Sequence, residues 1–181
     1  MISVAMAELP QDIAELVAGE KVLGDAPIWD EASDPRYVVF THSLTVGEPP
    51  TGGFQLRAKV SKRWADRDAL LQLEYAPAGR RSEVPLWRLD WKPFHTHDNK
   101  GWPPDVPWES FPRSHQHPFA DNFKAEARRM RGSNLPAARA FPSDPNTLSD
   151  FLALGGELFR IKDIRKVSLP VIGEDLFWSE A

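Results

Sequence analysis

Cysteine is absent from this 181-residue sequence. The chain therefore cannot form a disulfide, a thiolate metal site or a cysteine nucleophile. Long apolar runs are missing as well, since no window approaches the roughly 18 residues that a membrane span needs. The N-terminal segment "MISVAMAELPQD" lacks the basic region of a signal peptide. These absences predict a cytoplasmic protein with no membrane association.

Basic residues are scarce in the first part of the chain. Residues 1–50 hold nine acidic and two basic side chains, whereas residues 51–181 hold 17 acidic and 20 basic ones. A basic region behind an acidic segment suits a phosphate-containing ligand, but two solvated surfaces explain the same asymmetry. We expect an acidic N-terminal helix and arm at residues 1–35. Residues 36–181 are expected to form a single α+β domain, with an insert rich in proline, tryptophan and histidine at residues 93–118.

Alternating apolar and polar residues predict four consecutive strands. Short connections that contain glycine and proline separate them, which is typical of an antiparallel meander. One side of each strand is apolar, so helices should cover only that face. The predicted fold class is α+β, with an antiparallel sheet of four to six strands and helices packed on one face. The predicted strands span residues 36–46, 54–60, 70–75 and 85–91, with helices at 10–19, 121–132 and 146–154 and a weak edge strand within 158–172.

Residues at alternate positions of a strand point to the same side of the sheet. His42, Trp87 and Trp91 fall on the apolar side, where core positions are expected. The other side carries charged and amide side chains, which form either an ordinary solvated surface or the floor of a site. These residues are Arg57, Lys59, Gln72, Glu74, Arg88 and Asp90.

Four of the five histidines lie in one segment, "RLDWKPFHTHDNKGWPPDVPWESFPRSHQHPFADNF". They form two His-x-His pairs, and in an extended chain both rings of such a pair can reach one metal ion. Against a metal, the spacer of 17 residues between the pairs contains four prolines, and a His-Glu-x-x-His helix is missing. We therefore predict no metal or cofactor, and elemental analysis would decide the alternative. The pairs are His95 with His97 and His115 with His117.

Proton transfer is the favoured interpretation of the cluster. Two imidazoles placed across a phosphodiester can act as base and acid, because histidine titrates near neutral pH. Arg88 would neutralise the phosphate and Asp90 would orient one ring. The other interpretation is structural, with buried rings bonded to the backbone and the tryptophans sealing a loop. Trp102 and Trp108 lie in the insert and are the candidates for stacking on a partner. The predicted catalytic residues are His95, His115, His117, Arg88 and Asp90, and the predicted substrate-binding residues are Arg57, Lys59, Asn99 and Trp102.

The order of these motifs resembles that of the TumE-like toxins of bacterial toxin–antitoxin pairs. In that family an Arg-x-Asp strand leads to a Pro-His element, followed by a second histidine motif and a closing helix. Here "WRLDWKPFHTHDN", "FPRSHQHPFADNF" and "DPNTLSDFLALGG" occupy those places. The chain departs from the pattern at Trp91, where the family has asparagine, and in its longer insert and its N-terminal arm. The resemblance implies a growth inhibitor that acts on RNA and has a cognate antitoxin as partner.

A non-catalytic interaction protein, encoded by a phage or mobile element, is the alternative. Its acidic arm would imitate nucleic acid, and its tryptophan-rich loop would dock on a protein partner. Seven tryptophans and the absence of a recognised catalytic signature agree with this alternative.

Overall fold

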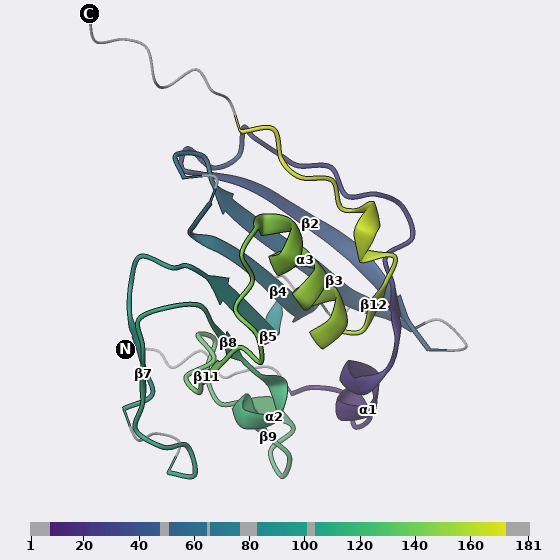
Figure 1. The fold of residues 1–181 in the computed structure, drawn as a ribbon. Helices are drawn as coiled ribbons and strands as arrows, with labels where there is room; N and C mark the ends of the chain where they lie inside the picture. Colours follow the sequence, from purple (N-terminus) through teal and green to yellow (C-terminus); the bar gives the residue numbers. More distant parts are fainter. Residues whose placement is uncertain (1–7, 48–50, 65, 77–82, 101–103, 173–181) are drawn as a thin grey trace, which may run out of the picture.

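The computed structural model describes residues 8–47, 51–64, 66–76, 83–100 and 104–172. Within them the chain forms an eight-stranded, mostly antiparallel sheet, two short hairpins and three α-helices, so the predicted α+β class is confirmed (Figure 1). The order of strands in the sheet is β11-β8-β5-β4-β3-β2-β1-β12. In chain order the elements are α1 (Ile13–Ala18), β1 (Lys21–Val22), β2 (Tyr37–Val46), β3 (Thr51–Ser61), β4 (Ala69–Tyr75), β5 (Val84–Trp91), β6 (His97–Asp98), β7 (Ser110–Phe111), β8 (His115–His117), α2 (Phe119–Asn122), β9 (Phe123–Lys124), β10 (Arg129–Met130), β11 (Arg139–Ala140), α3 (Leu148–Leu158), β12 (Ile161–Lys162) and a 3₁₀ turn (Ile164–Lys166).

The expected sheet of four to six strands is too small. The four long strands β2 to β5 form the predicted antiparallel meander. Strands of two or three residues extend it at both edges, with β8 and β11 beyond β5, and β1 and β12 beyond β2. Segments this short have too few residues for a clear alternating pattern, which is why the sequence did not reveal them.

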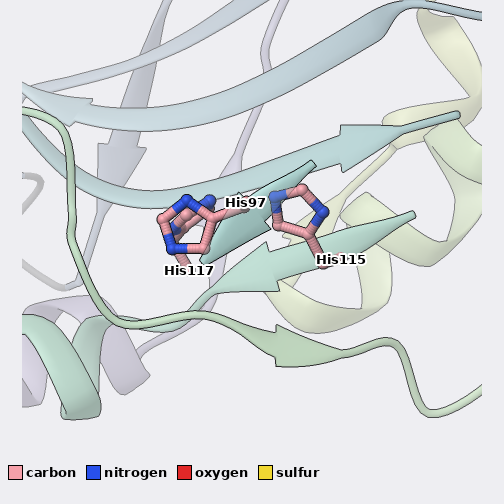
Figure 2. A group of neighbouring side chains, drawn as sticks. All are labelled: His97, His115 and His117. Atoms are coloured by element: carbon pink, nitrogen blue, oxygen red, sulfur yellow. The ribbon is translucent and has the colours of Figure 1, made fainter. Parts of the chain in front are cut away.

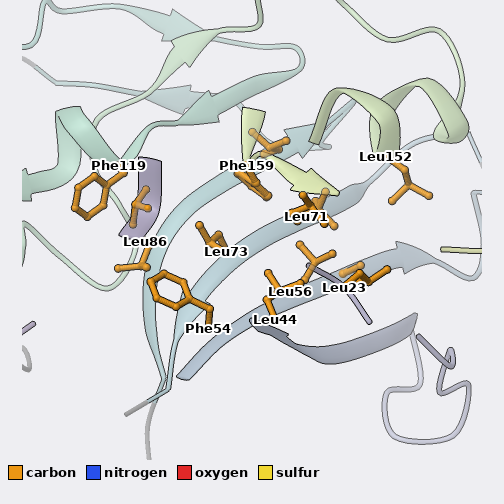
Figure 3. Close-up of a cluster of buried hydrophobic side chains, with 14 of the residues drawn as sticks. Leu23, Leu44, Phe54, Leu56, Leu71, Leu73, Leu86, Phe119, Leu152 and Phe159 are labelled. Carbon is orange, nitrogen blue, oxygen red and sulfur yellow. The ribbon is translucent and has the colours of Figure 1, made fainter. Parts of the chain in front are cut away.

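Helix α3 covers one face of the sheet (Figure 1). It begins at the capping box of Thr147 with Asp150 and buries Phe151 against the stacked ring of Trp91. Gly155 lets the helix approach the sheet closely, because a Cβ atom there would lie 2.2 Å from Leu71 Cδ2. The apolar side chains between the layers form the core (Figure 3). This helix runs a full turn beyond the predicted end at residue 154.

The helix predicted at residues 121–132 is wrong. The chain forms the four-residue helix α2, followed by the β9–β10 hairpin. The side chains from Ala125 to Arg129 are all exposed, so a helix there would have no apolar face to bury, and short helices need such packing to be stable.

The N-terminal segment belongs to the core. Four of its apolar side chains pack in the same buried cluster as the sheet residues. Strand β1 pairs with both β2 and β12, and the pairing with β12 is parallel. Among the described residues, no helix is both long and apolar enough to cross a membrane. The four buried side chains are Leu9, Ile13, Val17 and Leu23.

Candidate functional site

The polar face of the sheet brings a guanidinium, a carboxylate and two imidazoles together. Strand β8 adds to the edge of β5, with Arg88 opposite His117 and Asp90 opposite His115. Because side chains alternate along each strand, all four point to the face that α3 does not cover. Gln116 points to the other face, where its Oε1 accepts a hydrogen bond from Trp87 Nε1 at 3.2 Å.

The insert supplies a third imidazole. The β6–β7 hairpin pairs His97 with Phe111 and places the His97 ring against both rings of β8 (Figure 2). The centroid of His97 lies 4.6 Å from that of His117 and 5.5 Å from that of His115. The His115 and His117 centroids are 5.0 Å apart. His97, and not the predicted His95, therefore completes the cluster, and the side chain of His95 is exposed.

Each of the three rings is oriented by a backbone carbonyl. His97 Nε2 lies 3.1 Å from Pro136 O, His115 Nδ1 lies 2.8 Å from Arg113 O, and His117 Nδ1 lies 2.5 Å from Leu135 O. A carbonyl oxygen only accepts hydrogen bonds, so these ring nitrogens carry the hydrogens. In the neutral form of such a ring, the other nitrogen is a lone-pair acceptor. One nitrogen from each ring lies within 4.8 Å of its counterparts on the other two.

Asp90 adds a fourth acceptor to the cluster. Its Oδ2 lies 3.2 Å from His117 Nε2 and 3.6 Å from His115 Nε2. Arg88 supplies the positive charge, with Nε 2.8 Å from Asp90 Oδ2 and Nη2 2.6 Å from His117 Nε2. Burial acts to raise the pKa of Asp90, but contact with His117 and the charge of Arg88 outweigh it and lower that pKa to about 2. The carboxylate is therefore ionised at neutral pH.

Both imidazoles of β8 are neutral at neutral pH. His117 is fully buried, and burial lowers its pKa to about 4 even though the Asp90 carboxylate lies beside it. Burial also lowers the pKa of His115. The cluster thus places lone-pair acceptors from the two buried β8 rings beside one carboxylate, and imidazole and carboxylate are the ligand types of many metal sites.

Two buried asparagines hold the segment that orients the rings. Asn122 Oδ1 accepts from Ala137 N at 2.9 Å, and its Nδ2 donates to Ala137 O at 2.9 Å. Asn99 makes the same pair of bonds with Ala138, at 2.8 and 3.1 Å. These bonds fix residues 135–138, which carry the carbonyls that hold His117 and His97. Asn99, predicted to bind substrate, is 2% exposed and its amide is used in this way.

The predicted basic residues Arg57 and Lys59 lie on the same face, on β3, two strands from β5. The register places Arg57 opposite Gln72, which is in turn opposite Arg88. The guanidinium of Arg57 lies 3.8 Å from the carboxylate of the buried Glu74. Burial raises the pKa of Glu74 and lowers that of Lys59. Arg57 and Lys59 therefore flank the cluster without touching it.

The tryptophans divide between core and surface. Trp91 is buried in a stack with Phe151, and Trp87 packs edge-on against Phe159. Trp108, in the insert, is 73% exposed. Trp102 lies outside the described residues. His42 is half-buried, and its Nε2 lies 2.8 Å from the Leu23 carbonyl oxygen.

A shallow groove of about 240 Å³ opens beside the cluster. Phe111 lines it, and the ring centroid of Phe111 lies 5.8 Å from that of His115. Arg113 and Asp144 give the groove charges of both signs. Its full lining is Ser110, Phe111, Pro112, Arg113, Ser114, Ala140, Phe141 and Asp144.

No protein-family model, curated protein or solved structure matches the chain. The resemblance to the TumE-like toxins therefore stays a prediction.

Proposed function

We propose that this chain is a metal-dependent hydrolase that acts on RNA, with His97, His115 and His117 as ligands of one divalent metal ion. The observation that carries the proposal is the orientation of the rings. A backbone carbonyl holds one nitrogen of each ring, and one nitrogen of each ring lies within 4.8 Å of its counterparts on the other two. Metal-binding histidines have this arrangement because the second hydrogen bond sets the tautomer and the direction of the ring.

The burial and separation of the rings support this proposal. A metal binds neutral imidazole, the form that burial favours at His115 and His117. Bonds of about 2.0–2.1 Å to a tetrahedral zinc ion would place neighbouring ligand atoms about 3.4 Å apart. The ring nitrogens lie within 4.8 Å, so small rotations of the side chains would close the site.

Three protein ligands leave a fourth position for water, as in catalytic zinc sites. Asp90 Oδ2, beside two of the ligand nitrogens, would accept a hydrogen bond from that water. A bound metal lowers the pKa of its water and so supplies hydroxide near neutral pH. The chemistry that such a metal would supply is hydrolysis of a phosphodiester, in which the phosphorus–oxygen bond to one ribose breaks and the proton given up by the water goes to the departing oxygen. Arg88 would stabilise the charge on the phosphate.

A metal-independent ribonuclease is the second candidate, and one contact favours it. Arg88 Nη2 lies 2.6 Å from His117 Nε2 and so occupies the lone pair that a metal would use. In this alternative the guanidinium stabilises the phosphate, and His115 and His117 transfer the protons, the role predicted for them from the sequence. The lowered pKa values of both β8 histidines weigh against it, because a two-histidine mechanism needs one of them protonated.

RNA is the proposed substrate because the motifs resemble those of TumE-like toxins and because basic side chains flank the cluster. The same resemblance leads us to propose that expression of the protein inhibits growth and that a cognate antitoxin neutralises it.

Cleavage of a labelled single-stranded RNA by protein purified without a His tag tests the proposal. We expect cleavage with added Zn²⁺ or Mn²⁺, its loss on chelation and its return when metal is restored. His117→Ala should lower the rate by more than the about 10- to 100-fold that loss of an outer-shell partner costs. His95→Ala, which changes an exposed ring outside the cluster, should leave the rate unchanged.

Cleavage that persists in chelator would favour the metal-independent alternative. RNA that stays intact with every metal would exclude both candidates.

A further inference from the structure

A second surface, at the end of β5 beyond Asp90, carries exposed aromatic rings between arginines. Trp64 is 41% exposed and Phe94 is 50% exposed, and their ring centroids lie 6.5 Å apart in an edge-to-face arrangement. The Arg67 guanidinium lies over both rings, at 5.9 Å from the Trp64 centroid and 5.8 Å from that of Phe94. Arg63 lies over Trp64 at 5.2 Å. We call Arg63, Trp64, Arg67 and Phe94 the platform.

The backbone builds the platform from two distant segments. The turn between β3 and β4 carries Trp64, and the segment after β5 carries Phe94. Asp68 N donates to Lys92 O at 3.1 Å and joins the two segments. Lys92 N in turn donates to Ser114 Oγ at 3.1 Å, next to the first histidine of β8. Phe94 lies four positions beyond Asp90, a span of at most about 14 Å, so the platform lies near the histidine cluster.

The charges of the platform are available to a ligand. Within the described ranges, neither Arg63 nor Arg67 forms an ion pair with a carboxylate. Both side chains are exposed and lie against aromatic rings. About half of each ring stays in contact with water, and a flat ring beside a guanidinium without a carboxylate partner suits a flat, anionic ligand.

We propose that the platform binds single-stranded nucleic acid, with bases stacked on Trp64 and Phe94 and phosphates paired with Arg63 and Arg67. Every base has a face that can stack, so this binding tolerates different sequences. A duplex hides the faces of its bases and is the poorer partner. An acidic peptide could use the two cations, but it has no rings to stack on the two aromatic side chains. The proposal goes beyond the hydrolase, because binding at the platform needs no metal.

Fluorescence polarisation with a labelled 12-nucleotide oligouridylate, in the presence of chelator, measures this binding in the full chain. We expect Trp64→Ala with Phe94→Ala to weaken binding by about tenfold or more, as loss of stacked bases does. Arg63→Gln with Arg67→Gln should reduce the slope of log affinity against log salt by about 1.4, or about 0.7 for each phosphate contact. Trp108→Ala is the matched control, since it removes a tryptophan of the insert that is even more exposed, at 73%, than Trp64.

Unchanged affinity in the Trp64→Ala Phe94→Ala variant, with its folding checked by circular dichroism, would overturn the proposal. Loss of binding in Trp108→Ala alone would move the binding surface to the insert and overturn it as well. Polyglutamate that competes as well as the oligonucleotide would mean that charge alone is recognised, again against the proposal. The binding assay contains chelator and needs no cleavage, and His95→Ala, outside both the cluster and the platform, should bind normally, so failure of the hydrolase and failure of the platform can be told apart.

Discussion

At the scale of single residues, the cluster depends on two buried asparagines that lie outside it. His97 and His117 point where they do because two carbonyls of residues 135–138 hold one nitrogen of each ring. That segment is held in turn by the amides of Asn99 and Asn122. The sequence offered no signal for this role, because a buried asparagine resembles an exposed one until its partners are known.

Asn122→Ala tests this support. The change removes three hydrogen bonds and leaves the carbonyl of Pro118 and both backbone groups of Ala137 without their amide partner. We expect the free energy of unfolding to fall by about 3 kcal/mol, because buried groups left unsatisfied cost about 1–3 kcal/mol each. Urea denaturation measures the change, with the exposed Asn134→Ala as control. Equal stability of the two variants would mean that Asn122 does not hold the segment.

At the scale of elements, pattern and length decided what could be predicted. The strands β2 to β5 alternate over seven or more residues each and were predicted with small errors at their ends. The short strand β8 was not predicted as a strand, although its two histidines were predicted to face the same site as Arg88 and Asp90. The choice between His95 and His97 could not be made from the sequence. It depends on the β6–β7 hairpin, whose paired residues are 12 or more positions apart in the chain.

The junction of α1 and β1 contains a buried lysine with a testable pH dependence. Lys21 Nζ donates to the carbonyls of Val17 and Gly19 at the end of α1, at 2.6 and 2.9 Å. Burial and the nearby charge of Arg160 lower the pKa of Lys21 to about 8. Between that value and 10.5 the unfolded chain binds more protons than the folded one, so stability rises with pH.

Raising the pH from 8 to 10 should therefore increase the free energy of unfolding of the parent, relative to that of Lys21→Met, by about 2 kcal/mol. Thermal or urea denaturation at each pH measures this difference. Below pH 8 the difference between the two proteins should stay constant. Parallel stability curves over the whole range would show that the ammonium of Lys21 is not desolvated.

At the scale of the whole molecule, one strand connects the two surfaces. Arg88 and Asp90 on β5 belong to the cluster, and the chain that leaves β5 reaches the platform at Phe94. Helix α3 and the core lie on the opposite face of the sheet, so either surface can change without disturbing the main packing. The N-terminal segment is part of that core through Leu9 and Ile13. Deletion of residues 1–35 would therefore destabilise the fold, and a loss of function in that variant would not show that the segment binds a partner.

The metal content of tag-free protein, measured by elemental analysis after reconstitution with Zn²⁺ and gel filtration, tests the central claim most directly. His95 and His97 form one His-x-His pair, but only His97 lies in the cluster. The three-histidine centre predicts about one zinc per chain in the parent and in His95→Ala, and a loss of most of it in His97→Ala. Zinc bound equally by the two variants, or absent from the parent, would contradict it.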